Sequence, residues 1–263
     1  IAYGLRNGLQ INAANPASYT AVDSLTFIFD AGLSLQNANF KENGVSINAK
    51  NSSFDYLAMQ FRLWKRMGMA VGFLPYSTVG YNMTQVNSIN KDEYGEDIES
   101  FHNYKGEGGL QQVFFFLVFK VFNNLSIGAN LSYLYGDISY ATMTSFNNTN
   151  AFSSVRSQKI IINSYKLDLG AQYTQKLGQK HVVNLGATYS YGHNMHSEGY
   201  NYTETYDSNS TLQTHSGDTI NNAFSLPHTF GVGMTYVYDN SLTVGMDYTL
   251  QKWADCKYFN KEG

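Results

Sequence analysis

The stretch Leu125–Tyr135, LSIGANLSYLY, alternates between two kinds of side chain. Its odd positions carry Leu, Ile, Ala, Leu, Tyr and Tyr, whereas its even positions begin with Ser, Gly, Asn and Ser. A period of two predicts a β-strand, because successive side chains of a strand point to opposite faces. The strand therefore has one apolar face and one face of small, mostly polar residues.

The same alternation recurs in other parts of the chain, at Lys166–Thr174, Val183–Tyr191, Thr229–Tyr238 and Leu242–Gln251. The polar face carries Gly, Ser, Thr and Asn, whereas the outward face of a soluble sandwich usually carries Lys and Glu. Apolar residues and Tyr gather on the opposite face. This pattern is typical of a transmembrane barrel, with lipid outside and a polar lumen inside. The sequence therefore predicts an all-β protein that forms an antiparallel transmembrane β-barrel.

The composition agrees with a membrane barrel and excludes several other classes. Charged residues make up only 14% of the 263 residues, and the chain has 21 Tyr, 17 Phe and 23 Gly. A soluble domain has about 25% charged residues. The formal net charge of −3, without a basic patch, argues against nucleic acid as a partner. The single Cys256 excludes an internal disulfide framework and a cysteine zinc site.

The connections between the predicted strands alternate between short and long. Short turns are predicted near Arg66, at Phe122–Asn124, at Lys176–His181 and at Tyr238–Ser241, and long polar loops at Gln36–Ser52, Ser88–Gly106, Thr144–Ser157 and Met195–Asn222. Outer-membrane barrels have short periplasmic turns and long external loops. We count about nine strands, starting near residues 24, 53, 69, 107, 125, 158, 182, 223 and 242. Because single-chain bacterial barrels have an even number of strands, we expect further strands in a longer protein.

The segment NAANPASYTAVDSLTFIFDAGLS, which begins at Asn12, resembles the FadL/TodX family of outer-membrane transport proteins in its Bacteroidetes form. Three further stretches are similar to strands of that family: Gly72–Tyr81, Gly106–Gly136 and Leu226–Tyr236. Together these motifs span nearly the whole chain.

The resemblance implies a fourteen-stranded barrel whose lumen is plugged by an N-terminal hatch. Residues 1–23 would form the hatch, with Asn15, Pro16 and Ala17 as its motif, and residues 24–263 would form the barrel. A simple turn before the first strand is the alternative for this motif. The resemblance also implies an integral protein of the bacterial outer membrane, in contact with outer-membrane lipids and lipopolysaccharide. It would take up hydrophobic small molecules, such as long-chain fatty acids, by passive diffusion.

A proline inside a predicted strand marks a candidate exit. Pro75 lies between Gly72 and Gly80, and proline inside a sheet requires a bulge, a kink or a free edge. In the resembled family a kink in the third strand opens a lateral gap for the ligand. An ordinary bulge, or a strand that has already ended, is the alternative.

The candidate ligand-binding residues of the lumen are Phe114, Phe116, Val118, Arg62 and Trp64. The three apolar residues share one face of the only predicted strand that is apolar on both faces. They suit either a hydrophobic ligand or packing of the hatch, and we favour packing. Arg62 and Trp64 would face the lumen by strand parity. By the same parity three carboxylates face inward, namely Asp30, Asp168 and Asp247. An internal salt-bridge network with Arg62 is favoured over capture of a fatty acid carboxylate.

Two other function classes compete with uptake. The barrel could act as a docking or scaffold subunit of a secretion or assembly complex, with other outer-membrane proteins as partners. A barrel lipase is less favoured, because the sequence offers no nucleophile and base pattern. The acidic segment Lys91–Glu99 fits a solvated loop better than a calcium site. We therefore predict no catalytic residue, no metal site and no cofactor.

Overall fold

The computed structural model describes residues 3–5, 12, 14–21, 27–42, 44–91, 97–148, 150–239, 241–259 and 261–262. The elements are η1 Pro16–Ala21, β1 Phe27–Glu42, β2 Val45–Trp64, β3 Met67–Lys91, β4 Asp97–Lys120, β5 Leu125–Phe146, β6 Ser153–Leu177, β7 His181–Ser190, β8 His193–Asn194, β9 Ser197–Tyr206, β10 Leu212–Asn221, β11 Ser225–Leu226, β12 His228–Tyr238, β13 Leu242–Lys252, β14 Lys257–Tyr258 and β15 Lys261–Glu262. The predicted hatch boundary at residues 23 and 24 lies outside the described residues.

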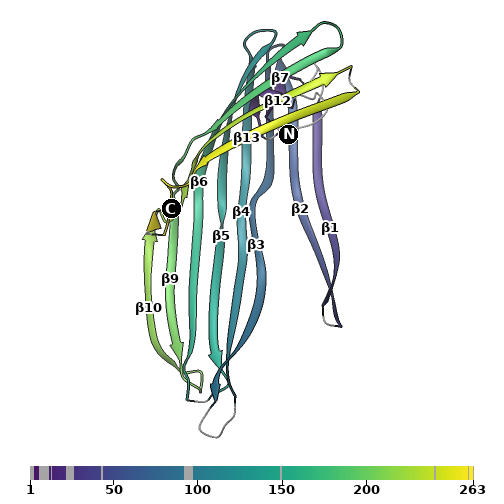
Figure 1. Cartoon of the computed structure of the whole chain (residues 1–263). Coiled ribbons are helices and arrows are strands. Elements are labelled where there is room, and N and C mark those ends of the chain that lie inside the picture. The colour runs from purple at the N-terminus through teal and green to yellow at the C-terminus, as the bar shows by residue number, and fades with distance from the viewer. Residues whose placement is uncertain are drawn as a thin grey trace.

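One large antiparallel sheet contains most of the chain. Its strands follow the order β1-β2-β3-β4-β5-β6-β7-β12-β13, and β9 and β10 are attached to it through β6. The sheet curves, and Figure 1 shows β1 at one margin and β13 at the other. Among the described residues no ladder joins β13 to β1. The all-β antiparallel prediction is therefore confirmed, whereas the sheet seen here is open and not a closed barrel.

The four short turns lie where the alternation ends, and the structure confirms their positions. They connect β2 to β3, β4 to β5, β6 to β7 and β12 to β13. The predicted long loops are wrong in extent, because strands fill most of them. The expected loop Gln36–Ser52, for example, is a β1–β2 ladder that continues to the pair Glu42–Val45. Backbone hydrogen bonds maintain these strands where the side chains are polar on both faces and show no alternation.

Two strand interruptions divide the sheet into two arms. β6 pairs with β7 over its C-terminal half, from Asp168–Ser190 to Leu177–His181. It pairs with β9 over its N-terminal half, from Ser153–Tyr206 to Ile162–Ser197. Between these ladders, β8 pairs only with β11. Figure 1 shows β7, β12 and β13 turning away from the direction in which β9 and β10 continue.

We call the arm of β9 and β10, with the parts of β3–β6 beside it, the extension. β3, β4, β5 and β6 contain 25, 24, 22 and 25 residues. β7, β12 and β13 contain only 10, 11 and 11 residues. About 9–11 residues of a tilted strand cross the hydrocarbon of a bilayer. The longer strands therefore have about twice the length that a membrane crossing needs.

The two faces of the sheet differ in the way that the alternation predicts. The outer face exposes large apolar side chains such as Leu131 at 56%, Val232 at 54% and Met246 at 69%. The inner face buries Asn130 and Ser132, each 1% exposed. Among the described residues, no helix has the length and apolar character to cross a membrane.

Candidate functional site

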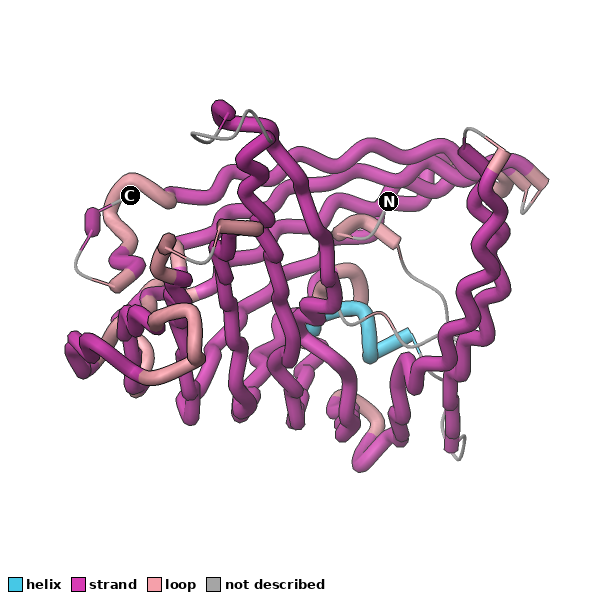
Figure 2. The backbone as a smooth tube through the Cα atoms, turned by 90° about the horizontal axis from the view of Figure 1, so that it is seen from below, coloured by secondary structure: helices cyan, strands magenta, loops and turns pink. Residues whose placement is uncertain are grey.

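The N-terminal segment lies on the inner face of the sheet. The 3-10 helix η1 contacts β3, β4, β5 and β6. Figure 2 shows this helix within the curve of the sheet. The motif residues Asn15 and Ala17 are fully buried there. The structure thus places Asn15, Pro16 and Ala17 against the sheet, and their role as a lumen plug stays a prediction.

Glycines of the inner face make room for this segment. A side chain at Gly128 would come within 2.7 Å of the Pro16 backbone. One at Gly170 would overlap the Asn15 side chain, and one at Gly186 would overlap the Tyr3 carbonyl oxygen. Since these glycines lie on β5, β6 and β7, three neighbouring strands are shaped to the same segment. The glycines that suggest a polar lumen face in the sequence therefore serve close packing.

Two buried amides hold the segment in place. The Asn15 Nδ2 donates to the Tyr3 carbonyl at 2.8 Å and to the Ala171 carbonyl at 3.3 Å. The Gln172 Nε2 donates to the carbonyls of Tyr3 and Leu5, both at 3.0 Å. The Asn15 Oδ1 also accepts the Ala17 backbone N–H at 3.0 Å. Buried amides need such partners, so these bonds specify one position of the segment on the sheet.

The predicted apolar residues of β4 form one inner cluster. Phe114, Phe116 and Val118 are 2%, 1% and 2% exposed. They pack with Ala58 and Ala70 of the neighbouring strands. The rings of Phe114 and Phe116 meet edge to face, with centroids 4.7 Å apart. The members of this cluster all belong to β2, β3 and β4, so packing against the hatch and binding of a ligand both stay predictions for these residues.

Arg62 and Trp64 lie at the end of β2, beside the turn to β3. The register of the β2–β3 ladder shifts between them. Trp64 is 69% exposed, which differs from the enclosed position that parity predicts. The Arg62 guanidinium donates to the carbonyls of Trp64 and Lys65. The register shift interrupts the regular ladder two residues before the turn, and the lumen-facing role of Arg62 and Trp64 stays a prediction.

A polar network crosses the inner face from β4 to β7, and Asp168 is its centre. Asp168 accepts hydrogen bonds from the Asn130 Nδ2 at 2.8 Å and from the Ser190 Oγ at 2.6 Å, and it forms a salt bridge with Lys166. Asn130 also accepts from the Ser132 Oγ at 3.1 Å, which in turn accepts from the Gln112 Nε2 at 2.6 Å. The inward position of Asp168 agrees with its parity. Its cationic partner is Lys166, on its own strand.

The other two predicted carboxylates have different surroundings. Asp247 accepts the Tyr3 backbone N–H at 3.3 Å, so it faces the N-terminal segment. Asp30 accepts a hydrogen bond from the Tyr56 hydroxyl at 3.2 Å on an exposed part of β1 and β2. The three carboxylates, which we expected in one network, therefore lie at separate places on the sheet.

Pro75 lies at an irregularity of β3. The register of the β3–β4 ladder shifts between Pro75 and Ser77, which is the predicted bulge. The ladder with β4 continues on both sides of this bulge. Gly72 makes room for the Phe114 ring, whereas nothing lies within 4 Å of a side chain added at Gly80. Lateral exit of a ligand at this place stays a prediction.

A band of aromatic rings surrounds the point where the arms separate. The stacked rings of Tyr165 and His193 have centroids 4.4 Å apart, and Tyr191 lies 5.4 Å from His193. Tyr189 continues the band, with Phe230 at 5.1 Å. Aromatic girdles mark the membrane–water interface of outer-membrane barrels. The sequence predicts the Tyr residues at the strand ends, and it does not predict that His193 stacks between Tyr165 and Tyr191.

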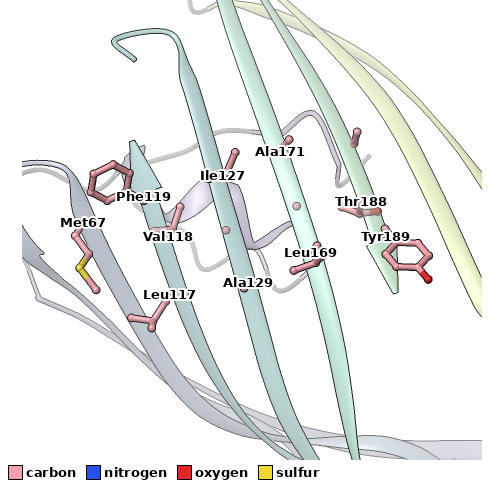
Figure 3. A pocket seen from close by; sticks show the side chains of 13 residues that line it. Met67, Leu117, Val118, Phe119, Ile127, Ala129, Leu169, Ala171, Thr188 and Tyr189 are labelled. Carbon is pink, nitrogen blue, oxygen red and sulfur yellow. The ribbon is translucent and has the colours of Figure 1, made fainter. Parts of the chain in front are cut away.

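A shallow apolar hollow lies on the outer face, toward the short turns. Its volume is about 590 Å³. Figure 3 shows it between Met67 and Tyr189, with the small side chains of Ala129 and Ala171 between the larger ones of Leu117, Phe119, Ile127 and Leu169. Since these residues belong to the apolar outer face, the hollow is a feature of the same surface.

A second apolar cluster closes the inner face at the base of the extension. It combines Leu110 and Leu134 of the main sheet with Met195, Leu226 and Phe259 of the segments that cross it. Leu134 and Met195 are fully buried. The extension is therefore anchored by a core of its own. Among the described residues no group of three His, Cys, Asp or Glu side chains could hold a metal ion.

Polar contacts order the tip of the extension. Asp207 Oδ1 accepts the backbone N–H groups of Asn209 at 2.9 Å and Thr211 at 2.8 Å. These bonds lower the pKa of Asp207, and the bond from the Thr211 backbone N–H has the largest effect. The Tyr206 hydroxyl donates to Glu204 at 2.8 Å, and this bond raises the pKa of Tyr206. A turn closed in this way presents a defined polar surface.

Comparison with known proteins corrects the family assignment. The model of the BamG family, a family related to the Bam complex, matches residues 4–262. A search of curated proteins gave no match. The resemblance to FadL/TodX is therefore wrong, because its short strand and proline motifs are features that other outer-membrane families can share. The family and the all-β fold are consistent with the outer membrane. With nearly its whole length matched, this chain belongs to the BamG family.

Proposed function

We propose that this chain is a docking subunit of an outer-membrane assembly complex related to Bam. The apolar outer face anchors it in the membrane, and the extension binds other outer-membrane proteins. Membership of the BamG family supports an assembly role over fatty acid uptake. Uptake was implied by the FadL resemblance and has no support once the family is corrected.

The membrane part would comprise β7, β12, β13 and the adjoining halves of β3–β6. The outer face of these strands is apolar, as a lipid-facing surface must be. Since backbone groups in lipid must all be paired, the free edges of β1 and β13 would also be paired in the membrane. We therefore infer that this sheet is part of a closed barrel wall, with its short turns in the periplasm.

The single observation that carries the proposal is the surplus length of the strands. A strand of 24 residues such as β4 spans about 80 Å. The hydrocarbon of a bilayer is only about 30 Å thick. The surplus is a hydrogen-bonded wall with its own apolar core at the base, which is a rigid surface and not a set of loops. Such a wall offers a preformed surface to a partner, which suits a docking subunit.

Affinity purification from native outer membranes tests this function. The full-length protein would carry a tag at a periplasmic turn, and mild detergent extraction would be followed by quantitative mass spectrometry. We expect Bam subunits in near-stoichiometric amounts. A variant with residues 197–221 replaced by a short Gly-Ser linker removes β9 and β10 and should retain the membrane part. Loss of those subunits from this variant would support the extension as the docking part.

A protein that purifies alone, in mild detergent and after crosslinking in cells, would disprove the docking function. Retention of every partner by the variant without β9 and β10 would move docking away from this hairpin. The variant's own resistance to SDS before heating is the control that its barrel is intact.

A further inference from the structure

β2 and β3 separate along much of their length. Their ladder runs from the pair Trp64–Met67 only as far as Leu57–Phe73. Beyond it, β2 pairs only with β1 and β3 only with β4, among the residues that the structure describes. Figure 1 shows the two strands diverging away from their turn. Each therefore presents a free edge to the other across an open seam.

Irregularities on both strands cause the separation. On β3, Pro75 lacks a backbone N–H and the register with β4 shifts before Ser77. On β2, the register with β1 shifts between Tyr56 and Phe54, at the same level. Bulges bend a strand and increase its local twist. Two bulges facing each other prevent the β2–β3 ladder from extending.

The free edge of β3 lacks the usual protection against strand pairing. Natural edges carry charged side chains, especially Lys, that discourage addition of another strand. Between Met67 and Asn90 the sequence has no charged residue. The edge also exposes apolar side chains, namely Tyr81 at 39%, Met83 at 58%, Val86 at 50% and Ile89 at 58%.

The free edges of the other long strands, among the described residues, carry charged side chains. β1 carries Asp30 and Lys41, β13 carries Asp247 and Lys252, and β10 carries Asp218. The free part of β2 carries Lys50 and Asp55. The edge of β3 is thus the exception, and it lies in the extension that we propose as the docking part.

The edge is also held in a strand conformation before any partner arrives. β3 pairs with β4 from Ser77–Leu110 to Lys91–Asp97. The Asn103 Nδ2 adds side-chain bonds to Asn82 at 2.8 Å and to Thr84 at 3.0 Å. A preorganised edge lowers the entropic cost of adding a strand.

We propose that the β3 edge from Ser77 to Asn90 pairs with a β-strand of a partner outer-membrane protein. This inference rests on the proposed docking function and names its surface. Unpaired backbone groups call for an extended segment, and the exposed apolar residues favour a strand with few charges. Because β2 is antiparallel to β3, a single added strand can be antiparallel to only one of them. Because the free edge of β3 is uncharged, we assign the added strand to β3.

A photocrosslinking residue at Thr84, in the free edge of β3, tests the contact in cells. Ser52, in the free edge of β2, is a control position on the other side of the seam. In the full-length protein in native outer membranes we expect Thr84 to crosslink to a Bam subunit, on an extended segment with few charges. Ser52 should give a much weaker product with that segment.

Charge substitution gives an independent measurement. Met83→Lys with Val86→Lys places charges on the free edge, where they should reduce recovery of that subunit by about tenfold or more. Met143→Lys is the control, because Met143 is also an exposed methionine of the extension, at 44%. It lies on β5, which is paired on both sides with Asn103 and Val155. This control should leave recovery within about twofold.

The outcomes separate the two proposals. If Bam subunits co-purify but Thr84 crosslinks to none of them and the lysine pair changes nothing, the edge assignment is wrong and the docking function stands. A Thr84 product with a second copy of this chain would also overturn the assignment, as would equal products from Ser52 and Thr84. If no Bam subunit co-purifies with the unaltered protein, the docking function and the edge assignment fail together.

Discussion

The strand β13 and the strand β10 have similar lengths and differ in what surrounds them. In β13, Leu242–Lys252, apolar residues alternate with Thr, Gly, Asp and Gln. In β10, LQTHSGDTIN, no such alternation is present, although nearly every residue of both strands is exposed. Alternation arises where the two faces of a strand meet different media. The side-chain pattern therefore identifies β13 as a strand in the sequence, whereas β10 is recognised only by its backbone ladder with β9.

The largest effect is expected from the inner cluster of β4. Phe114→Ala removes a fully buried ring and should cost about 3–5 kcal/mol in the free energy of unfolding. Phe115→Ala, on the outer face and 40% exposed, is the matched control and should cost much less. Denaturant titration of both variants in detergent measures the difference. Equal losses of unfolding free energy in the two variants would contradict the distinction between a packed inner face and an exposed outer face.

Close packing of the N-terminal segment gives the next largest effect. A side chain at Gly186 would overlap the Tyr3 carbonyl oxygen, so Gly186→Ala should cost about 1–3 kcal/mol and displace the segment. Gly80→Ala, in the extension, meets nothing within 4 Å and serves as the control. Hydrogen exchange of Ala17 and Ser18 reports the displacement. Unchanged protection in Gly186→Ala would show that the segment can shift without loss.

The polar network around Asp168 allows a comparison between an enclosed and an exposed ion pair. Asp168→Ala leaves Lys166, Asn130 and Ser190 without their acceptor and should cost about 1–3 kcal/mol. Asp137→Ala removes an exposed partner of Lys159 at 3.3 Å and should cost about 0–1 kcal/mol. The thermal unfolding midpoints of the two variants should therefore differ. Similar midpoints would contradict the assigned role of the network.

The smallest effect concerns the tip of the extension and its response to pH. The pKa of Asp207 is lowered in the folded protein, chiefly by the Thr211 backbone N–H. Its contribution is therefore fully present above its unfolded pKa, about 3.9, and is lost as pH falls through the lower folded value. Protection of the Thr211 amide against exchange, relative to its intrinsic rate, should fall only in that acidic window. Asp207→Asn should abolish this pH dependence, and an unchanged profile in that variant would exclude Asp207 as its cause.

The sequence predicts the parts of the fold that depend on contrast between faces. The strands near Leu125, His181 and Leu242 begin where the alternation begins, and the short turns follow from its loss. The extension could not be predicted in this way, because its strands carry polar side chains on both faces and show no alternation. The residues Gln36–Ser52 of the β1–β2 hairpin look like a loop for the same reason.

The candidate site was predicted unevenly for similar reasons. Strand parity predicts that Phe114, Phe116 and Val118 share one face, and the structure buries all three. The pairing of Asp168 with Lys166 does not follow, because residues two apart share a face and either could have found a partner on another strand. The seam beside Pro75 depends on a second bulge in β2, near Asp55, which has no proline or glycine to signal it.

The two interruptions that separate β7 from β9 and β10 from β12 make the hairpin between them removable in principle. The β7–β12 ladder is complete up to the pair Ser190–Thr229, so a tight turn there would leave an ordinary membrane hairpin. The β9–β10 hairpin therefore lies outside the continuous pairing of β7 with β12, and it is joined to the sheet through β6. Changes within the β9–β10 hairpin would therefore leave the register of the β7–β12 ladder intact.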